Sequence, residues 1–157
     1  MTALYQNCGI VSITLVAVFI EGKLTKTLRT GIYLFTVMNW VSFIGYELFP
    51  LTTKGYSGTF QDIMHTYVIT LAVVLLSILS LMYIIIGGIR EKRYRSLSIW
   101  ATICLFFMLI GAIGTGVVPP TYFGVFERFS VLSATFFNAI LGIFLFNGFQ
   151  FASKEGE

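Results

Sequence analysis

Charged residues are scarce in this chain. Asp, Glu, Lys and Arg make up only 11% of its 157 residues, whereas hydrophobic residues make up 57%. A soluble domain carries about 25% charged residues to cover its surface. This chain lacks the polar material to face water on all sides, so we expect it to face lipid. The composition excludes a soluble enzyme, a nucleic-acid-binding module and a disordered linker, and we expect no nucleic-acid partner.

Residues that hold metals and cofactors are also few, with one histidine and two cysteines. Cys8 and Cys104 lie in separate apolar runs, so a disulfide framework is not expected. A zinc hydrolase normally needs three His, Cys or carboxylate ligands and a general base, and bis-histidine haem needs a second histidine. No G-x-S-x-G elbow is present for a serine nucleophile. We therefore expect no metal and no other cofactor.

Five apolar runs dominate the chain, at residues 4–20, 31–49, 63–89, 97–118 and 129–149. A helix rises 1.5 Å per residue, so about 20 residues cross about 30 Å of hydrocarbon. A membrane β-barrel would instead alternate polar and apolar residues in segments of about ten. The pattern predicts an all-α protein, a polytopic transmembrane bundle of five helices that forms one domain over residues 1–157.

The basic residues predict the orientation of these spans. Eight of the ten fall in the loops and tail on one side: Lys23, Lys26, Arg29, Arg90, Lys92, Arg93, Arg95 and Lys154. Only Lys54 and Arg128 fall on the other side. By the positive-inside rule the first set faces the cytoplasm. We therefore expect a multi-pass protein of an inner or plasma membrane, with its N-terminus outside and its C-terminus in the cytoplasm.

Polar side chains gather at the predicted outer end, where Glu47 closes span two, Asp62 and His65 open span three, and Glu127 and Arg128 open span five. In one interpretation they are structural: Asp62 or Thr59 caps a helix and His65 lies at the wet interface. In the other they line an outer-leaflet pocket and bind a ligand, because charges at such depth face the bundle interior and pair. We expect Arg128 to pair with Glu47 or Asp62, and Glu127 to favour the dipole of its helix.

Within the spans, Asn39 and Asn138 are predicted to form hydrogen bonds between helices, which contribute about 0.6 to 2 kcal/mol each. No carboxylate, lysine or arginine lies near a span centre, which argues against an ion pathway. Gly111, Gly114 and Gly116 form a small-residue pattern in span four. We expect another helix to approach it closely, with a substrate-facing groove as the alternative.

The order of several short motifs resembles a known family. Phe49-Pro50 ends one span, Met64-His65 begins the next, and residues 124–128, Gly-Val-Phe-Glu-Arg, precede the last. This order is similar to that in the membrane family called domain of unknown function 998, found in bacteria and archaea. The resemblance implies six helices, so we expect the family's first helix to be missing here. Residues 51–54, Leu-Thr-Thr-Lys, also lack the acidic residue that the family often has there. The resemblance places His65, Glu127 and Arg128 at motif positions and implies no reaction.

Three function classes remain open. The first is a protein that binds or moves a lipid or small amphipathic molecule through an outer-leaflet cavity lined by spans two, three and five. The second is a scaffold that packs against another membrane protein. The third is an interfacial enzyme that uses His65 with Asp62 and Glu47 or Glu127. Membrane lipids are expected partners in each case. Because residues 4–20 barely cover the hydrocarbon thickness, we also expect a homodimer or a membrane-protein partner to cover span one.

Overall fold

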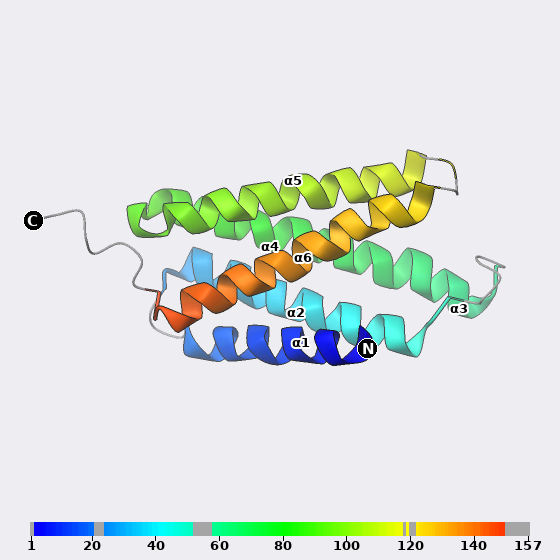
Figure 1. Ribbon diagram of the computed structural model, residues 1–157, viewed down its shortest axis with the longest axis horizontal. Coiled ribbons are helices and arrows are strands. Elements are labelled where there is room, and N and C mark those ends of the chain that lie inside the picture. The colour runs from blue at the N-terminus through cyan, green and yellow to red at the C-terminus, as the bar shows by residue number, and fades with distance from the viewer. Residues whose placement is uncertain (1, 21–23, 52–57, 118, 120–121, 150–157) are drawn as a thin grey trace, which may run out of the picture.

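Each apolar run forms a helix, because a backbone in lipid must satisfy its N–H and C=O groups within its own segment. The computed structural model describes the backbone of residues 2–20, 24–51, 58–117, 119 and 122–149, and their side chains except those of 2–8, 123 and 127. In these residues every regular element is helical (Figure 1). The elements are α1 (Thr2–Phe19), α2 (Lys26–Leu48), α3 (Phe60–Ile63), the π-helical η1 (Met64–Ile69), α4 (Thr70–Arg90), the 3₁₀ turn η2 (Lys92–Tyr94), α5 (Arg95–Val117) and α6 (Phe123–Phe146).

The five predicted spans are confirmed as five long helices within the described residues, the third being the continuous run of α3, η1 and α4. Their ends differ from the apolar runs. α2 begins at Lys26, five residues before the run, and α6 begins at Phe123, six residues before it. The reason is that polar residues at the membrane surface continue a helix without being apolar. α5 ends at Val117, before Pro119, because proline cannot donate a helical hydrogen bond.

The helices run antiparallel along the chain and close into a ring in which α1 packs on α2 and α6, α2 on α4, α4 on α5, and α5 on α6. The pairs α2–α4 and α5–α6 share the most extensive contacts. In Figure 1, α6 starts beside the end of α5 and crosses the bundle to meet α1 near its other end. We call the end where α2 stops and α3 starts the His65 end, and the opposite end, where η2 joins α4 to α5, the basic end.

Glycines allow the closest helix contacts. At Gly111, a Cβ would meet Ser130 Oγ and the carbonyl of Phe126, and at Gly114 it would meet the Phe126 ring, so both glycines face α6. The predicted close packing of span four is therefore confirmed at Gly111 and Gly114, whereas a Cβ at Gly116 would meet nothing within 4 Å. In the centre of the bundle, the rings of Phe35 (α2) and Phe137 (α6) pack edge to face, with centroids 5.1 Å apart.

The outer surface of the bundle is apolar. Leu71, Leu75 and Leu79 repeat every four residues along α4, and each is at least half exposed. A soluble monomer rarely exposes such a continuous apolar face. Three helical segments in the described residues are long and apolar enough to cross a membrane: Phe60–Arg90, Lys92–Val117 and Gly124–Phe146. In the same residues, α1 has only a shorter apolar helical part, Gly9–Phe19. The length and apolar composition of these helices therefore indicate a membrane protein.

Candidate ligand-binding site

The π-helical segment η1 positions the single histidine. The backbone N–H of Thr70 bonds the carbonyl of His65, five residues back, and the Thr70 hydroxyl donates to the same oxygen at 2.8 Å. Such a turn inserts an extra residue into a helix and is frequent at functional sites. It also changes the phase between α3 and α4. His65 consequently contacts the C-terminal end of α2.

The His65 ring is held by a backbone carbonyl and an aromatic ring. Its Nδ1 lies 2.6 Å from the carbonyl oxygen of Phe49, and its centroid lies 4.8 Å from that of Tyr46. A carbonyl oxygen only accepts, so Nδ1 carries the proton. In the neutral ring, Nε2 is then an acceptor. Among the hydrogen bonds of the described residues, none uses His65 Nε2. The imidazole is therefore oriented through one nitrogen, and the other is left for a further partner.

Further polar contacts tie the start of the third span to the end of α2. Because the Thr70 hydroxyl donates to the His65 carbonyl, the Tyr46 hydroxyl is the donor in its 3.2 Å contact with Thr70 Oγ1. The Gln61 side chain donates to the carbonyl of Pro50 at 2.8 Å. Carbonyls at a helix C-terminus have no partner within the helix. The Gln61 bond therefore satisfies a backbone carbonyl just after α2, and the Tyr46–Thr70 bond joins α2 to the start of α4, next to η1.

Asp62 has a structural role at the start of α3. Its backbone N–H donates to Thr59 Oγ1 at 3.2 Å, while its Oδ2 accepts from the hydroxyl and the backbone N–H of Thr59 at 2.8 and 3.3 Å. This reciprocal arrangement is a capping box, and the Asp62 side chain is fully buried. The capping function is the structural interpretation that the sequence offered for this pair.

The remaining predicted site residues form no described contact with His65, or have side chains outside the described residues. Glu47 is exposed near the end of α2, and Arg128 is exposed on α6. Within the described side chains, Arg128 forms no ion pair with Glu47 or Asp62, so the expected pairing is not found. The side chain of Glu127 lies outside the described residues, and its backbone is in the second turn of α6, whose first turn contains no acidic residue. The expected interaction with that N-terminus is therefore not supported. A pocket shared by all five residues stays a prediction.

An apolar groove of ≈ 430 Å³ lies on α2 next to His65. Its walls are Val37, Trp40, Val41, Ile44, Gly45, Leu48, Phe49 and, from η1, Ile69. Phe49 joins the groove to the imidazole, because its carbonyl bonds His65 Nδ1. α6 does not line this groove, in contrast to the cavity expected from spans two, three and five. No group of three His, Cys, Asp or Glu side chains that could hold a metal occurs in the described part of the chain.

Sequence reasoning found His65 but missed the groups that position it. Tyr46 is one of several aromatic residues near the end of a span and Thr70 is a polar residue inside one, and neither belongs to a motif. The third group, the Phe49 carbonyl, belongs to the backbone and leaves no trace in residue types. Only the Phe49-Pro50 pair marked the end of α2, where that carbonyl becomes available.

Comparisons with known proteins identify the family. A family model described as "Protein of unknown function (DUF998)" matches residues 3–143 of the chain. This match confirms the resemblance drawn from the motifs. No curated protein matches the chain, and no solved structure does.

Proposed function

Because the chain belongs to the DUF998 family of proteins of unknown function, its activity must be argued from its own residues, and we propose that it binds or moves a lipid or a small amphipathic molecule at the His65 end. The proposal depends on the oriented imidazole of His65, whose Nε2 has no hydrogen bond to the described residues. It depends equally on the apolar groove on α2, which is connected to the imidazole through Phe49. An amphipathic ligand needs a polar group to bind its polar part and an apolar surface to bind its apolar part.

The groove suits the apolar part of such a ligand. Its size falls in the range of about 300 to 1,000 Å³ that is typical of small-molecule sites, and its lining residues are all apolar. Val37, Val41, Ile44 and Leu48 follow one another along one side of α2, so a linear chain would lie parallel to the helix. Burial of each methylene group contributes about 0.8 kcal/mol.

The imidazole suits the polar part. A neutral His65 accepts a hydrogen bond at Nε2 from a hydroxyl group, and a protonated His65 donates one to a carboxylate or phosphate. The Phe49 carbonyl and the Tyr46 ring fix the imidazole before binding, which lowers the entropy that a ligand must offset. If the basic end faces the cytoplasm, as the loop charges predict, the ligand enters from the outer leaflet.

The proposal is tested with a photoreactive stearic acid that carries a diazirine in its acyl chain. The purified full chain in a non-ionic detergent is illuminated with this probe and digested, and labelled peptides are identified by mass spectrometry. We expect labelling of the α2 peptide that contains Val41 and Ile44, and competition by unlabelled stearic acid. His65→Ala should reduce the labelling about fivefold or more, because it removes the polar contact. Thr66→Ala is the matched control, since Thr66 is the exposed neighbour of His65.

Two results would overturn the proposal. One is labelling spread evenly over all lipid-facing helices. The other is equal labelling of the wild-type protein, His65→Ala and Thr66→Ala. Circular dichroism of each variant shows whether it retains its helices, so that a loss of labelling is not confused with unfolding.

The alternative functions draw less support from the described contacts. A scaffold that binds through the glycines of span four would need them on the surface, whereas Gly111 and Gly114 pack against α6. An interfacial enzyme would need a carboxylate next to His65, whereas the imidazole contacts a backbone carbonyl and Asp62 caps α3.

A further inference from the structure

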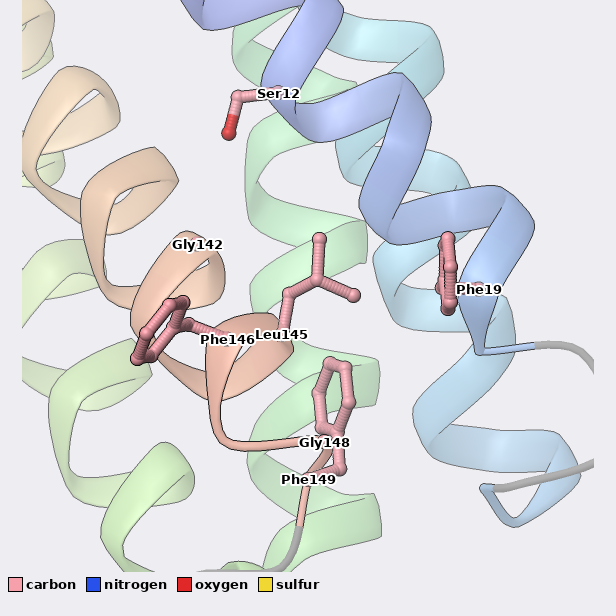
Figure 2. A pocket seen from close by; sticks show the side chains of 7 residues that line it. All are labelled: Ser12, Phe19, Gly142, Leu145, Phe146, Gly148 and Phe149. Atoms are coloured by element: carbon pink, nitrogen blue, oxygen red, sulfur yellow. The ribbon is translucent and has the colours of Figure 1, made fainter.

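A second groove lies at the basic end, between α1 and α6. It measures ≈ 410 Å³, and Ser12 and Phe19 of α1 face Gly142 and Leu145 of α6 across it (Figure 2). Phe149, just after α6, closes its lower side in that view. This groove shares no residue with the groove beside His65.

Phe149 is held in place by the way α6 ends. The N–H of Phe149 bonds the carbonyl of Phe144, and the N–H of Gly148 bonds that of Leu145, both at 2.8 Å. This is the Schellman motif, with glycine at the position that needs a positive φ. Phe149 itself has a φ of 58°, which is uncommon for a bulky residue. Its ring is buried and contacts the Phe144 ring, and this packing offsets the backbone strain.

The same ring connects the groove to the basic loop between α4 and α5. The centroid of Phe149 lies 6.5 Å from that of Tyr94 in η2, and the Arg93 guanidinium lies 5.6 Å from the Tyr94 centroid. Around Arg93, the exposed basic residues are Arg90, Lys92 and Arg95. Glu91 is the acidic residue of this loop, so the four cations exceed the anion by three. The apolar groove thus ends close to a surface of net positive charge.

We propose that the groove between α1 and α6 binds an acyl chain of an anionic phospholipid, whose phosphate lies against Arg93. The chain would lie between Ser12 and Leu145, and the headgroup would pass Phe149 to reach the basic loop. The charge of the loop selects this occupant, because Lys and Arg beside a membrane attract anionic lipids. This site goes beyond the proposed function, because it lies at the opposite end of the bundle and uses different residues.

The experiment uses the full chain in a non-ionic detergent. The probe is phosphatidylglycerol, and the control is phosphatidylcholine, a zwitterionic lipid without net charge. Native mass spectrometry counts bound lipid as each is titrated. We expect one phosphatidylglycerol to bind at lower concentration than phosphatidylcholine. Arg93→Gln should weaken its binding about fivefold, the effect of one basic residue near an anionic lipid. Arg128→Gln, an exposed arginine on α6 at the opposite end of the bundle, is the matched control and should change binding less than twofold.

A variant that fills the groove tests the acyl-chain part. In Gly142→Leu the new side chain enters the groove, because a Cβ at Gly142 meets only Ser12 Oγ, at 3.6 Å. Phosphatidylglycerol binding should weaken about tenfold. A phosphatidylglycerol with a diazirine in its acyl chain should also label the wild-type peptides that contain Ser12 and Leu145, which tests the site without any substitution.

Three outcomes would overturn this inference. The first is equal binding of the two lipids. The second is equal weakening by Arg93→Gln and Arg128→Gln. The third is a groove occupied by a second copy of the chain, seen as a dimer mass that Gly142→Leu removes. None of them bears on the groove beside His65, so the two proposals stand or fall separately.

Discussion

Substitution of Gly31 by alanine tests the packing of α2 against α4, the helix that continues from η1. A Cβ at Gly31 would lie 2.8 Å from the backbone nitrogen of Ile84 and 2.9 Å from the carbonyl oxygen of Ser80. From the other helix, a Cβ at Gly87 would lie 2.9 Å from the backbone nitrogen of Leu28. Backbone atoms cannot move aside as a flexible side chain can. The added methyl group must therefore push the two helices apart.

Two opposing effects set the magnitude. Overpacking of a well-packed contact costs about 1 to 3 kcal/mol, and alanine in place of glycine inside a helix returns up to about 1 kcal/mol. Because the added Cβ would make three contacts shorter than 3.0 Å, the cost lies in the upper part of this range, at about 2 to 3 kcal/mol. With about 1 kcal/mol returned, Gly31→Ala should lower the free energy of unfolding by about 1 to 2 kcal/mol. For a chain of about this length, each kcal/mol shifts the melting temperature by about 2 to 4 °C. We expect a decrease of about 2 to 8 °C.

Thermal unfolding in a mild detergent, followed by circular dichroism, measures this change. Gly9→Ala is the matched control, because Gly9 lies inside α1 and its Cβ would meet only Asn138 Nδ2, at an ordinary distance of 3.9 Å. That variant should melt at the wild-type temperature or slightly above it. If Gly31→Ala melted as high as Gly9→Ala, the close approach of α2 and α4 at Gly31 would be refuted.

Three further predictions concern other parts of the bundle. In a background without native cysteines, the cysteine of Lys54→Cys should react with an impermeant thiol reagent applied to intact cells, whereas that of Arg93→Cys should not. The opposite labelling would show that the predicted orientation in the membrane is wrong. Asn138→Leu should destabilise the fold by about 0.6 to 2 kcal/mol, because it removes the 2.8 Å hydrogen bond to Asn39 Oδ1. Adding Asn39→Leu should recover part of this loss, since it removes the acceptor left unpaired. A double variant less stable than the single one would contradict this. Cys104 is 2% exposed and donates to the Ser133 carbonyl, so N-ethylmaleimide should modify it only after unfolding, which mass spectrometry of native and denatured protein would show.

The candidate site shows where sequence reasoning stops. His65 was identified because it is the single histidine and lies at the start of an apolar run, and both facts are local. Its contacts depend on η1, and a π-helical turn has no residue-type signal of its own. The residues of η1, Met-His-Thr-Tyr-Val-Ile, would suit an ordinary α-helix as well. The turn forms where Gly45 lets Ile69 approach α2, which is a contact between helices.

Arg128 is a second residue whose neighbours could not be predicted from the sequence. Its charge and its place near the start of a span suggested a partner among the acidic residues of the His65 end. The neighbour of this part of α6 is instead α5, because Phe126 and Ser130 pack against Gly111 and Gly114. The order of the helices along the chain does not reveal which helix packs against the start of α6. Any helix with an end on the same side of the membrane could do so.

By itself, the sequence determined the features whose energy is local. Each apolar run specified a helix, Pro119 ended α5, and the Thr59–Asp62 pair capped α3, since each depends on residues within a few positions of one another. Only the tertiary structure decided which helices meet. Asn39 and Asn138 are 99 positions apart, and the two grooves arise from side chains of different helices. The physical reason is that helices form from neighbouring residues, whereas helix pairing depends on the shapes of whole faces, and many pairings bury similar apolar surfaces until glycines and polar contacts select one.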